Sequence, residues 1–238
     1  METLKVDYPD RIAKEVTCVT KDEFSKQVAG KNPFYLLHIS DNKHIRKFYP
    51  TVSKRTLGTE DRSVPRICTS VSITHCIAGA GIVEAYFDDE SFDGLFQVYG
   101  FKPNGVFKPS TKLVPDANQN REYWLVGKGV SNSEYVPLRL GQFFIHSIKQ
   151  YRKERKQEYV IYISVKEEGL WLTEDHYLEP GYYCVFGHNI ESKRKTCGMR
   201  KPMTVDKLEP IEKDEYDRHY SAYTLSTETI SQSGMLAW

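Results

Sequence analysis

Six short runs of aromatic and β-branched residues set the strongest limit on how this chain can fold. They cover residues 34–39, 66–70, 94–99, 123–126, 159–165 and 182–186, and most of them are bounded by Gly, Pro, Asn or Asp. Runs of about four to eight such residues between turn-forming residues are typical of β-strands. The chain is therefore expected to consist mainly of strands.

Helical patterns are fewer than strand patterns. Residues 21–29 open with an acidic turn, and residues 72–82 begin at Ser72, a residue type that caps helix N-termini. Residues 138–156 have apolar side chains at a spacing that predicts a third helix: Leu140, Phe143, Phe144 and Ile148. The proline-containing segment 102–120 is predicted to be a long loop, and no strand is expected after Gly198.

Composition and charge exclude several classes of protein. With 238 residues and 39% hydrophobic residues, the chain can bury a core, expected at 31–198 between an N-terminal extension (1–30) and a C-terminal tail or small lobe (199–238). The 33 basic and 32 acidic residues nearly balance, which gives no overall attraction to nucleic acid or to a membrane. No apolar stretch approaches the roughly 20 residues of a membrane helix, so no membrane partner is expected. The five scattered cysteines favour reduced thiols in a cytoplasm.

The first strand-like run ends in a His-x-Ser pattern. A histidine at a strand end can donate from its ring nitrogens to a ribose hydroxyl, and a serine two residues later lies on the same face. His38 and Ser40 are therefore candidates for binding a nucleotide ribose. The competing interpretation is that His38 only bonds to its own loop at the sheet edge.

The second run connects a strand to a helix. Pro65 and Arg66 begin the strand, Thr69 and Ser70 end it, and Ser72 is placed to cap the following helix. This location suits hydroxyls that hold a carboxamide, or backbone N–H groups that meet a phosphate. An ordinary strand, turn and capped helix would show the same pattern.

A basic connection precedes this second run. It contains Lys43, Arg46, Lys47, Lys54, Arg55, Arg62 and Arg66. Such a cluster suits a pyrophosphate or an acidic partner, and a solvated loop is the alternative.

These motifs occur in an order that resembles the ADP-ribosyltransferase-like fold. The resemblance rests on His38-x-Ser40, the stretch from Arg66 to Ser72, residues 159–162 and Gly169-Leu170-Trp171-Leu172-Thr173. The last stretch is similar to Gly-Val-Trp-Leu-Thr in tRNA 2′-phosphotransferases, and the first two resemble small, poorly characterised phage proteins. The fold implied is α+β, with a split, mostly antiparallel β-sheet core, flanking helices and an appended C-terminal segment.

The resemblance implies that NAD is a substrate whose ADP-ribose is transferred to a protein or nucleic acid. His38 would contact the adenosine-side ribose, Thr69 and Ser70 would line the nicotinamide pocket, and the implied binding set is His38, Ser40, Arg66, Thr69, Ser70 and Ser72. A glutamate at or just before a late strand stabilises the oxocarbenium-like transition state in this fold. Glu158 and Glu174 are the first candidates for this acid and Glu179 is a third, and the choice among them stays open.

Two functional hypotheses follow from different classes. One is an NAD-dependent transferase that acts on a host protein or nucleic acid, in the host-cell cytoplasm if the chain is phage-encoded. The other is a non-catalytic protein of the same fold that binds a host defence protein or sequesters a nucleotide. Cys68 stands where the phosphotransferases have a second histidine, so removal of an RNA 2′-phosphate is not expected. No metal site is expected, since Cys184, His188 and Cys197 lack metal-ligand spacing.

Overall fold

Antiparallel strands make up most of the structure. The computed structural model describes residues 14–20, 36–52, 60–88, 92–102, 105–126, 134–153, 156–173, 176–189 and 203–218. Within these ranges the main helices are α3 (Ile73–Gly79) and α4 (Ile82–Asp88). Residues 213–218 form a further short helix of about one and a half turns. The expected α+β class with mostly antiparallel strands is confirmed at this coarse level. The predicted helix at 21–29 lies outside the described residues.

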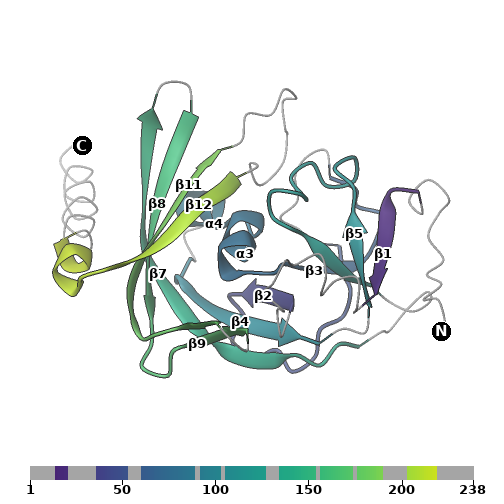
Figure 1. Cartoon of the computed structure of the whole chain (residues 1–238), viewed down its shortest axis with the longest axis horizontal. Helices are drawn as coiled ribbons and strands as arrows, with labels where there is room; N and C mark the ends of the chain where they lie inside the picture. The colour runs from purple at the N-terminus through teal and green to yellow at the C-terminus, as the bar shows by residue number, and fades with distance from the viewer. Residues whose placement is uncertain are drawn as a thin grey trace, which may run out of the picture.

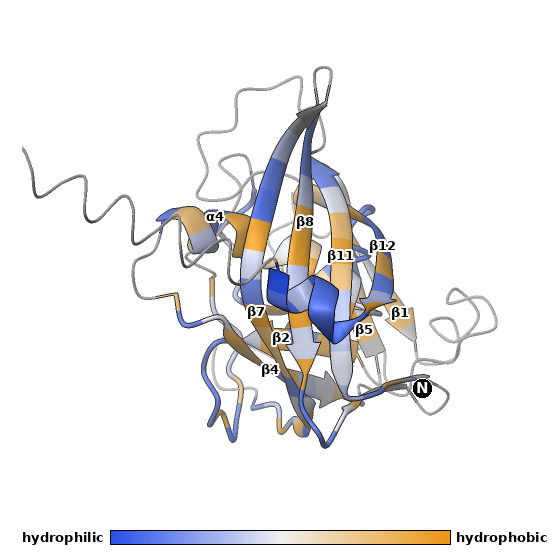
Figure 2. Cartoon of the chain, turned by 90° about the vertical axis from the view of Figure 1, so that its left-hand side faces the viewer, coloured by the Kyte–Doolittle hydropathy of each residue, from blue (hydrophilic) through white to orange (hydrophobic). Residues whose placement is uncertain are grey.

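The larger sheet has six strands in the order β12-β11-β8-β7-β4-β2. Every neighbouring pair in it is antiparallel. Figures 1 and 2 show β7, β8, β11 and β12 side by side. The strands are β2 (Leu36–Ser40), β4 (Leu95–Phe101), β7 (Leu138–Lys153), β8 (Lys156–Val165), β11 (Gly181–Asn189) and β12 (Met203–Ile211).

The smaller sheet has four strands in the order β1-β5-β6-β3. Its strands are β1 (Val16–Thr20), β5 (Gly105–Pro109), β6 (Tyr123–Val126) and β3 (Arg66–Thr69), and β9 (Leu170–Thr173) and β10 (His176–Leu178) form a separate pair. The six-stranded and four-stranded sheets are joined by backbone hydrogen bonds. Leu37 of β2 and Ser70, next to β3, exchange two of them, of 2.8 and 2.9 Å.

Helix α3 packs against β2 and β12 of the larger sheet (Figure 1). Ser72 caps it as expected, because its side chain accepts a hydrogen bond from the backbone N–H of His75. The helix buries Ile73 and Ile77 in the main hydrophobic core. Gly81 then adopts a left-handed conformation, with φ of +65°. The helical pattern predicted over 72–82 therefore ends early, and α4 begins after the break.

The predicted helix at 138–156 is wrong, because this segment forms the long strand β7. Phe143 and Ile145 are buried at the two-residue spacing of a strand. A bulge between Ile145 and Ser147 then shifts the register against β8, and Ile148 is buried as well. The bulge changes the two-residue spacing of Phe143 and Ile145 into a three-residue spacing between Ile145 and Ile148, which interrupts the alternation expected of a strand.

The expectation of no strand after Gly198 is also wrong. β12 pairs with β11 along its whole length, from Met203 opposite Asn189 to Ile211 opposite Tyr182. Few of its side chains are buried, since β12 is an edge strand of the sheet. An edge strand of this kind lacks the alternation on which strand prediction depends. Similarly, the predicted loop at 102–120 contains β5.

Gly94 is the glycine whose replacement is expected to disturb the larger sheet. Its φ is +72°, and an added Cβ would lie 2.3 Å from the carbonyl oxygen of Ile145. Because both the conformation and the space favour glycine, Gly94→Ala should lower the free energy of unfolding by roughly 1–3 kcal/mol, measured by urea denaturation. Gly181→Ala is the matched control, since its added Cβ would meet nothing closer than 3.9 Å. Equal stabilities of the two variants would contradict this prediction.

Candidate functional site

A pocket of about 400 Å³ lies where β2 and β3 meet. It is lined by His38 and Ser40 from β2, by residues of β3, by His75 of α3, and by the segment that precedes β6. Pockets that hold small organic ligands have volumes of about 300–1,000 Å³. Segments far apart in the sequence thus form one ligand-sized site.

Most of the residues expected to bind a cofactor come together in this pocket. The lining includes His38, Ser40, Arg66, Thr69 and Ser70. Ser72 lies behind the lining residue His75, with its Oγ 2.5 Å from the His75 Nδ1. Burial, with the nearby charge of Arg121, lowers the pKa of His75 to about 4, so its ring is neutral at pH 7.

The expected glutamates do not gather there. Glu158 is half-buried on β8, between Tyr151 of β7 and His188 of β11, and it is not among the described residues that line the pocket. Strands β7 and β4 separate β8 from β2. Glu179 is exposed and is likewise absent from that lining, and Glu174 lies outside the described residues.

His38 is held in one orientation by its neighbours. Its Nδ1 lies 2.8 Å from the carbonyl oxygen of Cys68, and its ring packs edge-on against Phe48. A carbonyl only accepts, so Nδ1 carries the hydrogen. Burial lowers the pKa of His38, although the Cys68 carbonyl and the charge of Asp41 oppose the shift. The neutral ring therefore offers Nε2 as an acceptor, whereas the sequence suggested a donor.

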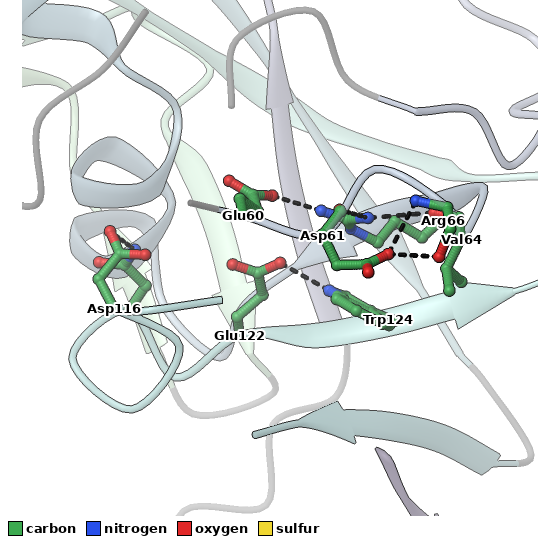
Figure 3. A network of polar contacts seen from close by, with 9 residues as sticks. Glu60, Asp61, Val64, Arg66, Asp116, Glu122 and Trp124 are labelled. Atoms are coloured by element: carbon green, nitrogen blue, oxygen red, sulfur yellow. Dashed lines mark hydrogen bonds and ion pairs between the residues drawn. The ribbon is translucent and has the colours of Figure 1, made fainter. Parts of the chain in front are cut away.

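Arg66 is buried in the pocket wall, and its charge is matched there. Its guanidinium forms an ion pair with Glu60, and the side chains of the two residues are 0% and 3% exposed (Figure 3). It also donates to the carbonyl oxygens of Asp61 and Val64, at 2.9 and 3.1 Å, and lies 4.4 Å from the ring centre of Trp124. Both Nη atoms of Arg66 are thus engaged, while its buried Nε has no hydrogen-bond partner in the described part of the chain. Because Glu60 matches its charge, Arg66 has little charge to offer a phosphate.

Glu122 is the acid that sequence reasoning missed. It directly precedes β6, is 5% exposed and lines the pocket. Its Oε1 accepts a hydrogen bond of 2.6 Å from Trp124 Nε1 (Figure 3). Burial, together with the negative charge of Glu122, raises the pKa of the Cys68 thiol well above its usual value. The indole N–H of Trp124 thus holds the carboxylate in place.

The hydroxyls of Thr69 and Ser70 fasten β3 to the same segment. Thr69 Oγ1 donates to the carbonyl oxygen of Tyr123 at 2.8 Å, and Ser70 Oγ donates to that of Asn120 at 2.5 Å. These bonds fix the backbone on both sides of Glu122. A signal for Glu122 was present in the sequence, since an acid directly before a strand is the pattern that pointed to Glu158. The segment 102–120 before it was predicted to be a long loop, so no site residue was sought beside it.

Two residues of the basic connection form ion pairs at the surface. Lys43, which is half-buried, pairs with exposed Asp93 at 2.9 Å, and exposed Lys47 pairs with exposed Glu134 at 2.8 Å. Arg46 and Arg62 are exposed. Lys54 and Arg55 lie outside the described residues. Among the residues that the structure describes, no cluster of His, Cys, Asp and Glu suited to a metal ion is found.

Comparison with known proteins adds no relative. Neither the models of protein families, nor the curated proteins, nor the solved structures include a match to this chain. In the described part of the chain, no helix has both the length and the apolar character needed to span a bilayer.

Proposed function

We propose that this protein binds NAD in the pocket between β2 and β3 and transfers its ADP-ribose group, with Glu122 as the assisting acid. The observation that supports the proposal is the convergence of His38, the Thr69 and Ser70 pair and Glu122 on one pocket. The resemblance to ADP-ribosyltransferases implies the same three components. Glu122 replaces Glu158 and Glu174 in this proposal because it directly precedes a strand and reaches the pocket.

The chemistry requires a site that stabilises positive charge. When the bond between the ribose C1′ and the nicotinamide nitrogen breaks, its electron pair goes to nicotinamide and neutralises the pyridinium ring. The ribose becomes an oxocarbenium-like cation until an acceptor oxygen or nitrogen attacks C1′ and loses its proton. A fixed carboxylate beside that ribose stabilises the cation. Glu122, held by Trp124, is such a carboxylate.

The other lining residues agree with this assignment. Asp41, Glu60 and Glu122 line the pocket, and Glu60 already matches the charge of Arg66. The remaining negative charge attracts a cationic ring. The aromatic side chains of Phe48 and Tyr49 are also in the lining, and aromatic faces attract cations. His38 Nε2 accepts a ribose hydroxyl, and Ser40 lies in the same lining.

Turnover of labelled NAD tests the proposal. We expect the full chain to release nicotinamide from NAD and to transfer labelled ADP-ribose to a component of a bacterial lysate. NAD should also raise the melting temperature of the protein, as any ligand of the folded state does. Stabilisation without turnover would support the non-catalytic alternative, a nucleotide-sequestering protein. Neither stabilisation nor turnover would reject the NAD site.

His38→Ala should weaken both effects in the same assays. Loss of the Nε2 acceptor removes one hydrogen bond to the ribose, so we expect roughly a tenfold loss of NAD affinity, since such a bond contributes about 1–1.5 kcal/mol. Lys43→Ala is the control, because Lys43 forms an exposed ion pair away from the pocket lining. Unchanged affinity in folded His38→Ala would remove His38 from the site.

A further inference from the structure

Asn120 presents a buried amide in the wall of the pocket. Its side chain is 2% exposed, and its Nδ2 donates to the Oδ2 of Asp116 at 2.8 Å. A carboxylate accepts hydrogen bonds, so Asp116 fixes which end of the amide faces it. The nitrogen is turned to Asp116 and the oxygen is turned away.

That oxygen, Oδ1, has no hydrogen-bond partner. The other polar groups of the residue are engaged, because its backbone N–H donates to Asp116 and its backbone oxygen accepts from Ser70. A buried amide oxygen without a donor costs free energy that a ligand N–H can recover. Gly79 of α3 also lines the pocket and lies beside the Asn120 side chain, since an added Cβ would be in van der Waals contact with Asn120 Nδ2 at 3.5 Å.

We propose that Asn120 Oδ1 accepts a hydrogen bond from the carboxamide NH₂ of nicotinamide, and that Asn120 thereby selects NAD over nicotinate adenine dinucleotide. This inference rests on the proposed function. The nicotinate analogue has a carboxylate in place of the carboxamide. It offers no donor to Oδ1 and would turn a negatively charged oxygen toward that oxygen.

The expected discrimination is large. A site that hydrogen-bonds a ligand N–H rejects an analogue without it far more strongly than an apolar site rejects a missing methylene. We therefore expect the protein to bind nicotinate adenine dinucleotide at least roughly 100-fold more weakly than NAD. Calorimetric titration of the full chain with each dinucleotide measures this ratio. The titrated protein carries Glu122→Gln, so that NAD is not consumed during the measurement.

Substitution of Asn120 should remove the preference. In Asn120→Ala the ratio of the two dissociation constants should fall to within a few-fold, mostly through weaker binding of NAD. Asn118→Ala is the matched control, since Asn118 lies in the same turn and is exposed. Asp116→Asn is a second variant that leaves Asn120 in place, and it should narrow the ratio because the amide is then free to turn its nitrogen to the pocket.

The outcomes separate this inference from the proposed function. If protein that retains Asn120 binds NAD and nicotinate adenine dinucleotide equally well, the inference is overturned. The proposed NAD site would still be supported by that result. The inference also fails if Asn120→Ala keeps the preference. Binding of neither dinucleotide would instead reject the proposed function itself.

Discussion

A Glu122→Gln variant is expected to release nicotinamide from NAD roughly 10²–10³ times more slowly than the wild-type protein, the usual effect of removing one electrostatic contact to a transition state. The substitution removes the negative charge and keeps the shape of the side chain. Its amide oxygen can still accept from Trp124 Nε1, so the pocket should stay formed. The loss should therefore appear in the rate of turnover more than in NAD affinity, measured by single-turnover release of nicotinamide.

Two other glutamates serve as controls for this result. Glu158→Gln should turn over NAD at the wild-type rate, because Glu158 lies on β8 and not among the described residues of the pocket. Glu174→Gln tests the acid expected after the Trp171 strand, which lies outside the described residues. A severe loss in Glu174→Gln with normal turnover in Glu122→Gln would transfer the catalytic role to Glu174.

Arg66→Met is expected to cause the largest loss of stability, about 3–5 kcal/mol of unfolding free energy. The substitution leaves the carboxylate of Glu60 buried without its partner. It also deprives the carbonyl oxygens of Asp61 and Val64 of a donor and removes the cation from the face of Trp124. Guanidinium chloride denaturation measures the loss, and NAD affinity should fall only as far as the pocket is distorted.

Matched variants distinguish a buried ion pair from an exposed one. Lys43→Met breaks the pair with Asp93, whose side chains are 33% and 54% exposed, and should cost less than about 1 kcal/mol. Combining Arg66→Met with Glu60→Leu removes both buried charges and should recover a large part of the lost stability. If Arg66→Met costs no more than Lys43→Met, the pair is not the buried contact described above.

Local patterns in the sequence identified many of the elements. The strand predicted at 123–126 has the bounds of β6, and the runs around His38 and Thr69 are β2 and β3. Turn residues and side-chain alternation act over a few neighbours, so they can be interpreted without the rest of the chain. The strands β7 and β12 were not predicted. A bulge disturbs the alternation in β7, and the edge position of β12 leaves few of its side chains buried.

The sequence by itself determined the strand-rich class, the position of His38 in a strand and the cap at Ser72, because these depend on near neighbours in the chain. Only the tertiary structure decided which acidic residue lies in the same pocket as His38. Glu122 reaches the pocket because β6 pairs with β3, with Tyr123 opposite Thr69, although these residues are far apart in sequence. The same packing buries Arg66 against Glu60 and Trp124. Because Glu60 matches the charge of Arg66, that charge is not available to a ligand. Such pairings depend on how distant strands align, and no local pattern specifies that alignment.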